Sequence, residues 1–281
     1  MVSGTAPFTA SPATVPNSLP RAALALANVQ YEKKGSIACV TVNRPKVLNA
    51  LNTPTWTDLQ AAFEDAKADA SVHGVILTGA GDKAFASGTD INQFRAFKTP
   101  QDAIDYEARI DHVLGMIEQC RVPTIAAING VCAGGGAGIA ACCDLRIGIG
   151  TAKFGFPIAR TLGNCLSMSN LSRLSALIGA ARLKEIIFTA RLIEAQEAFR
   201  LGLLNEMVDD LSALERRAGE LARLIASHAP LTLRSTKQAL LRMRPKVGED
   251  EDLILMCYQS RDFREGMDAF LNKRPPQWTG E

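Results

Sequence analysis

The sequence predicts an α/β fold with a largely parallel sheet, followed by a helical C-terminal region. Between residues 37 and 179, short apolar runs rich in β-branched residues alternate with amphipathic segments of helical period, the pattern of crossover units that build parallel sheets. After residue 179 the chain reads almost entirely as helix. At 281 residues, 47% of them hydrophobic, the chain is long enough for one α/β domain with a helical appendage or for two small domains.

The predicted strands share a short length, β-branched residues and flanking Gly, Pro or Asn. They cover residues 37–42, 75–78, 124–128 and 145–149. Thr53 and Pro54 suit the cap and first turn of a helix that continues to about residue 66. A second helix is predicted over residues 102–118, with its apolar side chains on one face.

The C-terminal third is predicted to be helical over residues 181–189, 195–200, 211–227, 231–243 and 250–270. The last of these segments has a break near Ser260. Pro230 suits a first helical turn, and the acids of residues 249–252 suit the positive end of the next helix. We expect this third to form a small domain or an assembly surface.

We divide the chain into a disordered tail at 1–27, a core at 28–205 and a helical region at 206–281. The tail is rich in Ala, Ser, Thr and Pro and has a single basic residue, Arg21, which is unlike a secretory or mitochondrial leader. No stretch approaches the roughly 20 apolar residues of a membrane span. We therefore expect a cytoplasmic protein.

The charge balance and the cysteines exclude several functional classes. A net charge of +2 gives no reason to expect a nucleic-acid or membrane partner. None of the seven cysteines forms a Cys-x-x-Cys pair or lies near a histidine in zinc-like spacing, so we expect reduced thiols and no metal site.

A glycine-rich turn at residues 134–138 follows the strand at 124–128 and opens a helical segment. Backbone N–H groups at such a turn point toward negative charge, which suits an oxyanion or a phosphate. The nucleotide-binding patterns Gly-x-Gly-x-x-Gly and Gly-Lys-Ser/Thr do not match. The alternative is that small residues here only allow close helix packing.

A second turn, at residues 86–90, follows the strand at 75–78. Two turns at the ends of consecutive strands can each offer one N–H to a single oxygen. Such an oxyanion hole stabilises an enolate or a tetrahedral intermediate by roughly 2.7–4 kcal/mol per donor.

Four ordered motifs, at residues 43–51, 83–91, 127–136 and 143–146, resemble those of the crotonase, or enoyl-CoA hydratase/isomerase, superfamily. Residues 189–198, 202–208 and 263–270 fit as well, so the resemblance covers about residues 28–278. It implies a β-β-α superhelix core with a helical C-terminal trimerisation region, assembled as a homotrimer or a dimer of trimers. It also implies an acyl-CoA substrate and no tightly bound cofactor, since coenzyme A is part of the substrate.

By motif position, the resemblance makes Thr89 and Gly135 the two N–H donors of the oxyanion hole. It also implies contacts with the coenzyme. The pantetheine arm would pass Lys46, Val47, Leu48, Ala86, Asp90 and Ile91, and the adenine and phosphate end would meet Phe263 and Lys273.

The sequence departs from the family at the two glutamates that hydratases use, which are replaced by Gly138 and Ile158. We expect both replacements to line the acyl pocket. General acid–base catalysis is worth ~10²–10⁴-fold, so two-glutamate hydration and single-glutamate isomerisation are both disfavoured. Asp111, on the helix edge that also carries Glu107 and Glu118, is the first candidate for a substitute acid. Its alternative is a solvated carboxylate near Arg109 or Arg121.

The segment 159–169 supplies donors rather than bases, from Arg160, Thr161, Asn164 and Ser167. Such donors could hold the carboxylate of a malonyl-type substrate. We therefore expect an enzyme of the enoyl-CoA hydratase/isomerase type, a lyase or isomerase of fatty acid metabolism, that stabilises an enolate. The alternatives are a malonyl-type acyl-CoA decarboxylase and a non-catalytic binder of CoA thioesters.

Overall fold

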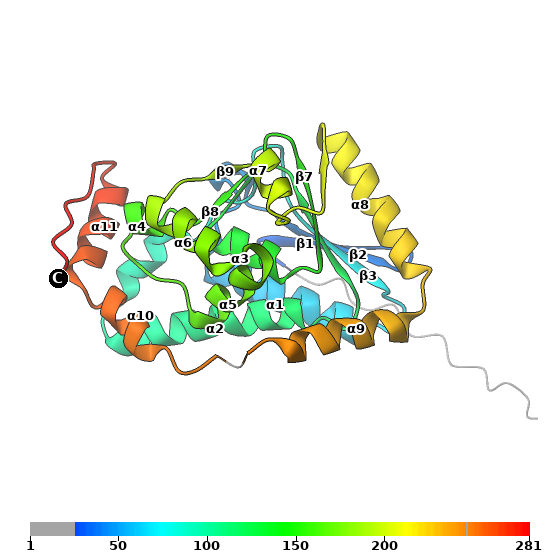
Figure 1. The fold of residues 1–281 in the computed structure, drawn as a ribbon, viewed down its shortest axis with the longest axis horizontal. Coiled ribbons are helices and arrows are strands. Elements are labelled where there is room, and N and C mark those ends of the chain that lie inside the picture. Colours follow the sequence, from blue (N-terminus) through cyan, green and yellow to red (C-terminus); the bar gives the residue numbers. More distant parts are fainter. Residues whose placement is uncertain (1–25, 246) are drawn as a thin grey trace, which may run out of the picture.

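The computed structural model describes residues 26–245 and 247–281, so the predicted tail lies almost wholly outside it. A six-stranded sheet runs through the molecule in the order β1-β2-β3-β5-β7-β10 (Figure 1). Its strands are β1 (Val29–Lys34), β2 (Ile37–Val42), β3 (Gly74–Gly79), β5 (Thr124–Ile128), β7 (Leu145–Ile149) and β10 (Glu206–Val208). All neighbours are parallel except β1 and β2, so the predicted largely parallel sheet is confirmed.

A second, four-stranded sheet has the order β4-β6-β8-β9. Its strands are β4 (Ala84–Ala86), β6 (Val131–Ala133), β8 (Lys153–Gly155) and β9 (Ile193–Glu194). The chain passes three times from the large sheet to the small one, from β3 to β4, from β5 to β6 and from β7 to β8. Each of these strand pairs is followed by helix. This repeated β-β-α winding is the arrangement that the resemblance implied.

Helices enclose the two sheets, and they are α1 (Thr53–Ala68), α2 (Pro100–Glu118), α3 (Gly135–Cys142), α4 (Ile158–Thr161), α5 (Met168–Ile178), α6 (Ala180–Thr189), α7 (Ala195–Arg200), α8 (Leu211–Ala226), α9 (Pro230–Met243), α10 (Glu251–Tyr258) and α11 (Arg261–Leu271). Two 3-10 turns, η1 (Pro45–Val47) and η2 (Ile91–Ala96), complete the chain. Figure 1 shows α8 on one side of the large sheet and α1 to α3 on the other. None of the helices in the described ranges is long and apolar enough to span a membrane.

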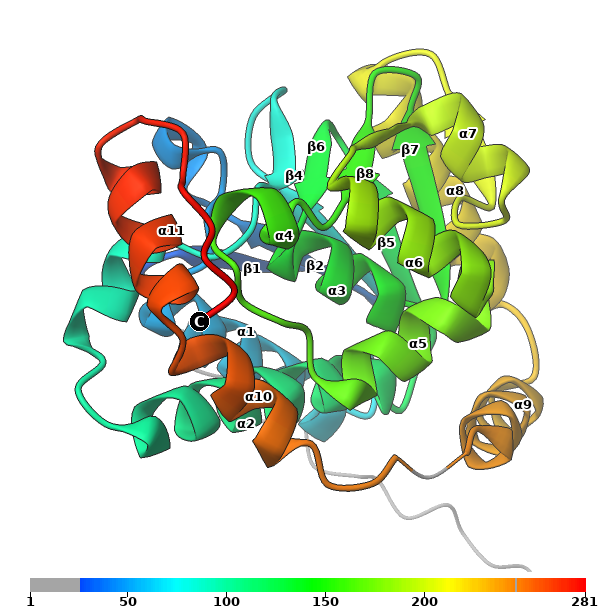
Figure 2. The ribbon, with the colours of Figure 1, turned by 60° about the vertical axis from the view of Figure 1, so that its left-hand side comes forward.

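The C-terminal region does not separate from the core at residue 206. β10 pairs with β7, and α8 packs on β3, β5 and β7. The helical part that leaves the sheet begins with α9, which has no buried residue and lies apart from the other helices in Figure 2. The chain then returns through α10 and α11, which pack on α2, α4 and η2. The predicted break near Ser260 is present, because the Ser260 hydroxyl accepts the Phe263 N–H and caps α11.

The loop between β2 and α1 is fixed to the turn between β3 and β4 by one buried amide. Asn49 is 1% exposed and has a left-handed φ of 55°. Its Oδ1 accepts from the Arg44 N–H at 2.9 Å, and its Nδ2 donates to the carbonyls of Ala80 and Ala84 at 2.9 and 2.7 Å. A buried polar group is costly unless it is hydrogen-bonded. These three hydrogen bonds therefore hold the loop of residues 44–51 against the turn between β3 and β4.

Candidate active site

A cavity of about 460 Å³ opens between the two small-residue turns, α2 and the C-terminal helices. Its wall is formed by residues of both turns, of α2, of the segment 156–170, and of α10 and α11. They include Val47, Leu48, Gly88, Thr89, Asp90, Ile91, Tyr106, Glu107, Ile110, Leu114, Gly134, Gly135, Gly138, Ile158, Asn164, Asn170 and Tyr258. The structure therefore brings the two predicted turns to one cavity.

The two turns touch each other. Gly88 has a φ of 116°, and a Cβ placed on Gly134 would lie 3.4 Å from the Gly88 Cα. A Cβ on Gly135 would lie 3.9 Å from the Thr89 Oγ1. Gly136 could carry no side chain at all, since its Cβ would come within 2.2 Å of the Ala86 carbonyl oxygen. Gly136 is therefore needed for the close approach of the turns, whereas Gly88 and Gly134, with φ values of 116° and 50°, are needed for the backbone conformation.

The backbone N–H groups of Thr89 and Gly135 are both left without an acceptor in the described part of the chain. The Leu51 N–H donates to the Gly88 carbonyl, and the Leu51 carbonyl accepts from the Asp90 N–H, both at 2.8 Å. The Thr89 N–H, between them, takes part in neither bond. Gly135 is the first residue of α3, where no preceding turn supplies an acceptor. The cavity therefore has two free N–H donors, on adjacent turns, among its lining residues.

The side chain of Thr89 is held by Tyr106. The two hydroxyl oxygens lie 2.8 Å apart, and the Tyr106 ring packs edge-on against Phe94. Burial raises the pKa of Tyr106 far above its ordinary value, so its phenol stays protonated. The neighbouring Asp90 pairs with Arg44 at 3.2 Å and caps η2.

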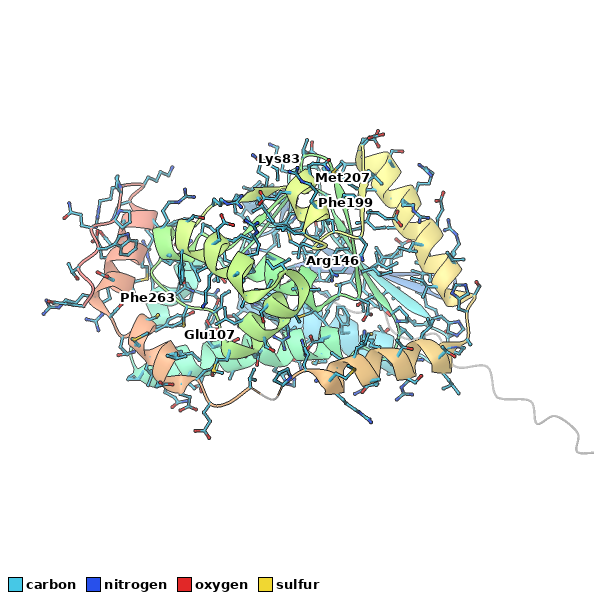
Figure 3. The ribbon with its side chains drawn as sticks, viewed as in Figure 1. Lys83, Glu107, Arg146, Phe199, Met207 and Phe263 are labelled. Atoms are coloured by element: carbon cyan, nitrogen blue, oxygen red, sulfur yellow. The ribbon has the colours of Figure 1, made fainter. Side chains whose placement is uncertain are left out.

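The residues predicted to contact the coenzyme separate into two groups. Val47, Leu48, Asp90 and Ile91 line the cavity beside the two turns. The remaining four do not line it: Lys46 borders an adjoining hollow, Ala86 is fully buried, Phe263 packs against Phe94 and Tyr258, and Lys273 is exposed beyond α11. Figure 3 shows Phe263 on α11. The coenzyme contacts of these four stay predictions.

Gly138 and Ile158, which by the resemblance stand where hydratases carry glutamates, both line the cavity. A Cβ on Gly138 would lie 3.6 Å from a Leu114 methyl carbon and 3.6 Å from the Asn170 Oδ1. The place of the first glutamate is therefore bounded by a hydrocarbon side chain and an amide.

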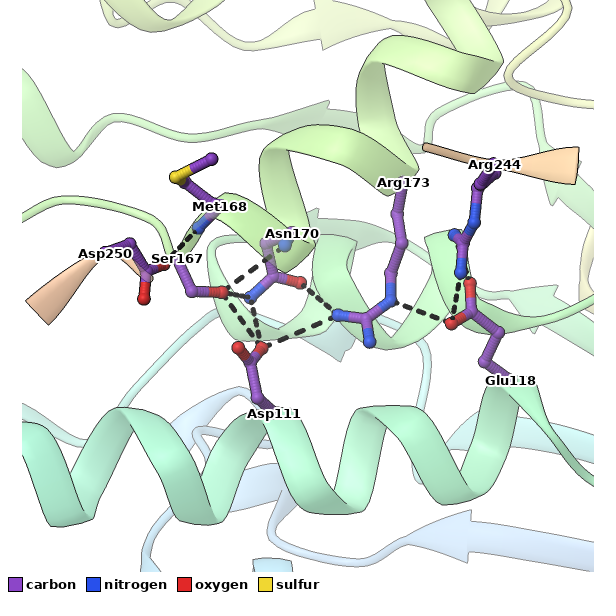
Figure 4. Close-up of polar contacts among 8 residues, drawn as sticks. All are labelled: Asp111, Glu118, Ser167, Met168, Asn170, Arg173, Arg244 and Asp250. Carbon is purple, nitrogen blue, oxygen red and sulfur yellow. Dashed lines mark hydrogen bonds and ion pairs between the residues drawn. The ribbon is translucent and has the colours of Figure 1, made fainter. Parts of the chain in front are cut away.

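Asp111, the predicted substitute acid, lies in a polar network and not among the residues lining this cavity. Its Oδ1 accepts from the Ser167 hydroxyl at 2.9 Å and lies 3.4 Å from the Asn170 Nδ2 and 3.5 Å from the Arg173 guanidinium (Figure 4). Burial raises the pKa of Asp111. Its ion pair is with Arg173, on α5, and not with Arg109 or Arg121.

The network continues along α2 to Glu118, which is 8% exposed. Arg173 donates to Glu118 at 3.1 Å, and Arg244 donates to both of its carboxylate oxygens at 2.6 and 2.8 Å (Figure 4). Nearby, the Asp250 carboxylate accepts the Met168 N–H. These bonds hold Arg244, just after α9, against Glu118 of α2, and Asp250, just before α10, against the start of α5.

Glu107 is a carboxyl residue of the cavity wall to which the sequence analysis gave no role. It is 6% exposed, and its Oε1 accepts from the Tyr258 hydroxyl at 2.5 Å. Burial raises the pKa of Glu107 to about 7, although the bond from Tyr258 opposes the increase. The sequence placed Glu107 on the same helix edge as Asp111, but Tyr258 is 151 residues away and gave no signal.

The donors expected from residues 159–169 are only partly available. Asn164 lines the cavity, whereas Arg160 is exposed and the Ser167 hydroxyl is bonded to Asp111. Thr161 lines the cavity too, but its hydroxyl donates to the Pro157 carbonyl at 2.9 Å. No Lys, Arg or His lines the cavity in the ranges that the structure describes. Within the same ranges, no cluster of three or more His, Cys, Asp or Glu is placed to hold a metal ion.

Solved structures resemble this fold closely. An enoyl-CoA hydratase/carnithine racemase from Magnetospirillum magneticum superposes with a TM-score of 0.75 at 38% identity, covering 92% of this chain and 97% of that one. A methylmalonyl-CoA decarboxylase bound to 2-nitronate-propionyl-CoA gives a TM-score of 0.83 at 29% identity, covering 92% of this chain and all of the other.

The sequence comparisons agree. A short-chain-enoyl-CoA hydratase from Clostridium acetobutylicum is 38% identical over 259 residues, which is 89% of this chain and 96% of that protein. The family model for enoyl-CoA hydratase/isomerase matches residues 32–281. The chain therefore belongs to the enoyl-CoA hydratase/isomerase family, within the crotonase superfamily.

Proposed function

We propose that the protein binds an acyl-CoA thioester and stabilises its enolate, with the thioester oxygen held between the N–H groups of Thr89 and Gly135. The observation that carries this proposal is the pair of unbonded donors on two turns that touch at one cavity. An enolate carries more charge on its oxygen than the parent thioester does. Fixed donors therefore bind it more tightly than the substrate, which is the condition for catalysis.

The wall of the cavity argues against the two-glutamate hydration reaction. Gly138 and Ile158 have no proton to exchange, and Leu114 and Asn170 bound the space beside Gly138. We expect hydration of enoyl-CoA esters to be slow for this reason. An enolate formed by another step would still be stabilised, because the oxyanion donors belong to the backbone.

Decarboxylation of a malonyl-type CoA ester is the second candidate. Loss of carbon dioxide leaves its bonding electron pair on the α-carbon and forms the enolate without a base. Two observations favour it: the absent glutamates, and the TM-score of 0.83 with methylmalonyl-CoA decarboxylase. The absence of Lys, Arg and His from the described lining counts against it, because the substrate carboxylate would have to rely on the Asn164 amide and similar donors.

The test is a panel of enoyl-, hydroxyacyl-, malonyl- and aryl-CoA esters with mass spectrometry of the products, run on the wild type and on Thr89→Pro. Proline removes the N–H, so we expect turnover to fall about 10²–10³-fold. The matched control is Thr89→Ala, which keeps the N–H and should lose less. Undiminished turnover in a folded Thr89→Pro protein would refute the oxyanion assignment. Tight acyl-CoA binding with no product would instead indicate a non-catalytic binder.

We also propose that the chain assembles as a homotrimer or a dimer of trimers. Helix α9 carries the exposed apolar residues Leu231, Leu240 and Met243, which are 76%, 60% and 76% exposed. Exposed apolar side chains gathered on one helix favour association. The predicted mass in solution is three or six times the 30.1 kDa of one chain. A cytoplasmic location stays a prediction.

A further inference from the structure

Three acids on one edge of α2 have different surroundings, and only one of them is available for chemistry. Glu118 is paired with Arg173 and Arg244, and Asp111 is paired with Arg173. Glu107 has no cation partner among the described residues, and its bonded neighbour is the neutral hydroxyl of Tyr258. A carboxyl group held by two guanidinium ions does not readily take up a proton, whereas Glu107 is free to do so.

Glu107 also lines the cavity that holds the two turns. Glu107, Ile110 and Leu114 follow the spacing i, i+3, i+7 and all line the wall. Leu114 marks the place of the absent family glutamate, next to Gly138. Glu107 is seven residues earlier, about 10 Å along the helix axis. The residue before it, Tyr106, bonds to the side chain of the oxyanion residue Thr89.

We propose that Glu107 is the residue that exchanges a proton with the α-carbon of the bound thioester, with Tyr258 positioning its carboxyl group. This proposal rests on the proposed function. The carboxylate removes the α-proton, and the electron pair of the C–H bond becomes the α-carbon–carbonyl double bond of the enolate. The carbonyl π pair moves to the oxygen held by Thr89 and Gly135. In the reverse step, the Glu107 carboxyl returns a proton to the α-carbon.

The surroundings of Glu107 are suited to this role. On its own helix, Tyr106 and Asp111 are the nearest titratable groups; from elsewhere, Tyr258, Asp250 and Cys165 face it. The two aspartates disfavour the charged form, and burial disfavours it most. The resulting pKa of about 7 lets the same group act as base and as acid near neutral pH.

The experiment follows hydrogen exchange at the α-carbon of butyryl-CoA in deuterium oxide, using mass spectrometry of the recovered thioester. Butyryl-CoA is saturated and has no free carboxylate, so it reports proton exchange alone. We expect Glu107→Gln to slow the exchange at least ~10²-fold with butyryl-CoA affinity changed less than about 3-fold. Asp105→Asn is the matched control, since Asp105 is an exposed acid on the same helix, hydrogen-bonded to Gln101, and should exchange like the wild type.

A pH profile separates a catalytic role from a structural one. We expect wild-type exchange to rise with pH through about 7, because the base must be ionised. Tyr258→Phe should move the midpoint to higher pH, since the lost bond favoured the carboxylate. A profile that does not move contradicts the positioning role of Tyr258.

The outcomes distinguish the Glu107 proposal from the proposed function on which it rests. If the wild type binds neither butyryl-CoA nor any CoA ester of the panel above, both proposals fail. If it binds, but does not exchange or exchanges equally fast in Glu107→Gln, only the assignment of Glu107 fails. Exchange lost in Asp111→Asn and kept in Glu107→Gln would move the acid to residue 111 and overturn the proposal.

Discussion

Replacing Glu107 by Gln should make the protein more stable at alkaline pH while removing its proposed chemistry. Glutamine keeps the shape and the acceptor for Tyr258 but never carries a charge. In the folded protein, burial raises the pKa of Glu107 from 4.5 to about 7. The folded state therefore holds a proton that the unfolded chain has released between these two values. Wild-type stability falls as pH rises through this window and levels off above pH 7.

The magnitude follows from the shift, since each pKa unit is worth about 1.4 kcal/mol. Between pH 5 and pH 8 the wild type should lose roughly 2–3 kcal/mol relative to Glu107→Gln. The assay is urea unfolding at both pH values and one protein concentration, because assembly affects apparent stability. Asp105→Asn serves again as the control and should follow the wild type. If the difference between Glu107→Gln and wild type is the same at pH 5 and pH 8, the reasoning about Glu107 is wrong.

Two further predictions concern the network and the assembly. Glu118→Gln leaves Arg173 and Arg244 facing a neutral amide, so we expect a loss of ~3–5 kcal/mol in the free energy of unfolding; a loss below about 1 kcal/mol would show that the buried ion pairs contribute little. Leu240→Glu places a charge at one of the exposed apolar residues of α9 and should reduce the mass measured by light scattering to that of one 30.1 kDa chain; an unchanged multimer would remove Leu240 from the interface.

The sequence predicted the fold where local patterns are strong. The strand at 124–128 and the helix at 231–243 are found within one residue of their predicted ends. Helix α2 begins two residues earlier than expected because Thr99 and Asp102 form a capping box around Pro100. The strands of the small sheet were missed because β4, β6 and β8 have only three residues each, too few to show a period.

The site could be predicted as far as it depends on the backbone. Gly88 and Gly136 identify the turns, because Gly88 has a φ of 116° and a Cβ on Gly136 would lie 2.2 Å from the Ala86 carbonyl oxygen. The surroundings of the acidic side chains could not be predicted from the sequence in the same way. Asp111 and Glu107 are four residues apart on one helix edge, and the partners that distinguish them, Arg173 and Tyr258, come from distant parts of the chain. Periodicity places a residue on a face but does not reveal what packs against it.

The hydrogen bond from Tyr258 to Glu107 joins residues 151 positions apart in the sequence, and this separation affects the order of folding. The two glycine-containing turns belong to consecutive β-β-α units and can form while the chain is still being synthesised. The Glu107 carboxyl group, in contrast, receives its hydroxyl partner only after α10 docks, and closing so long a loop is slow compared with local folding. A nascent chain that ends before residue 258 would therefore present the two formed turns next to an unfinished cavity. In the proposed mechanism, catalytic competence is acquired last, when the C-terminal helices close over α2.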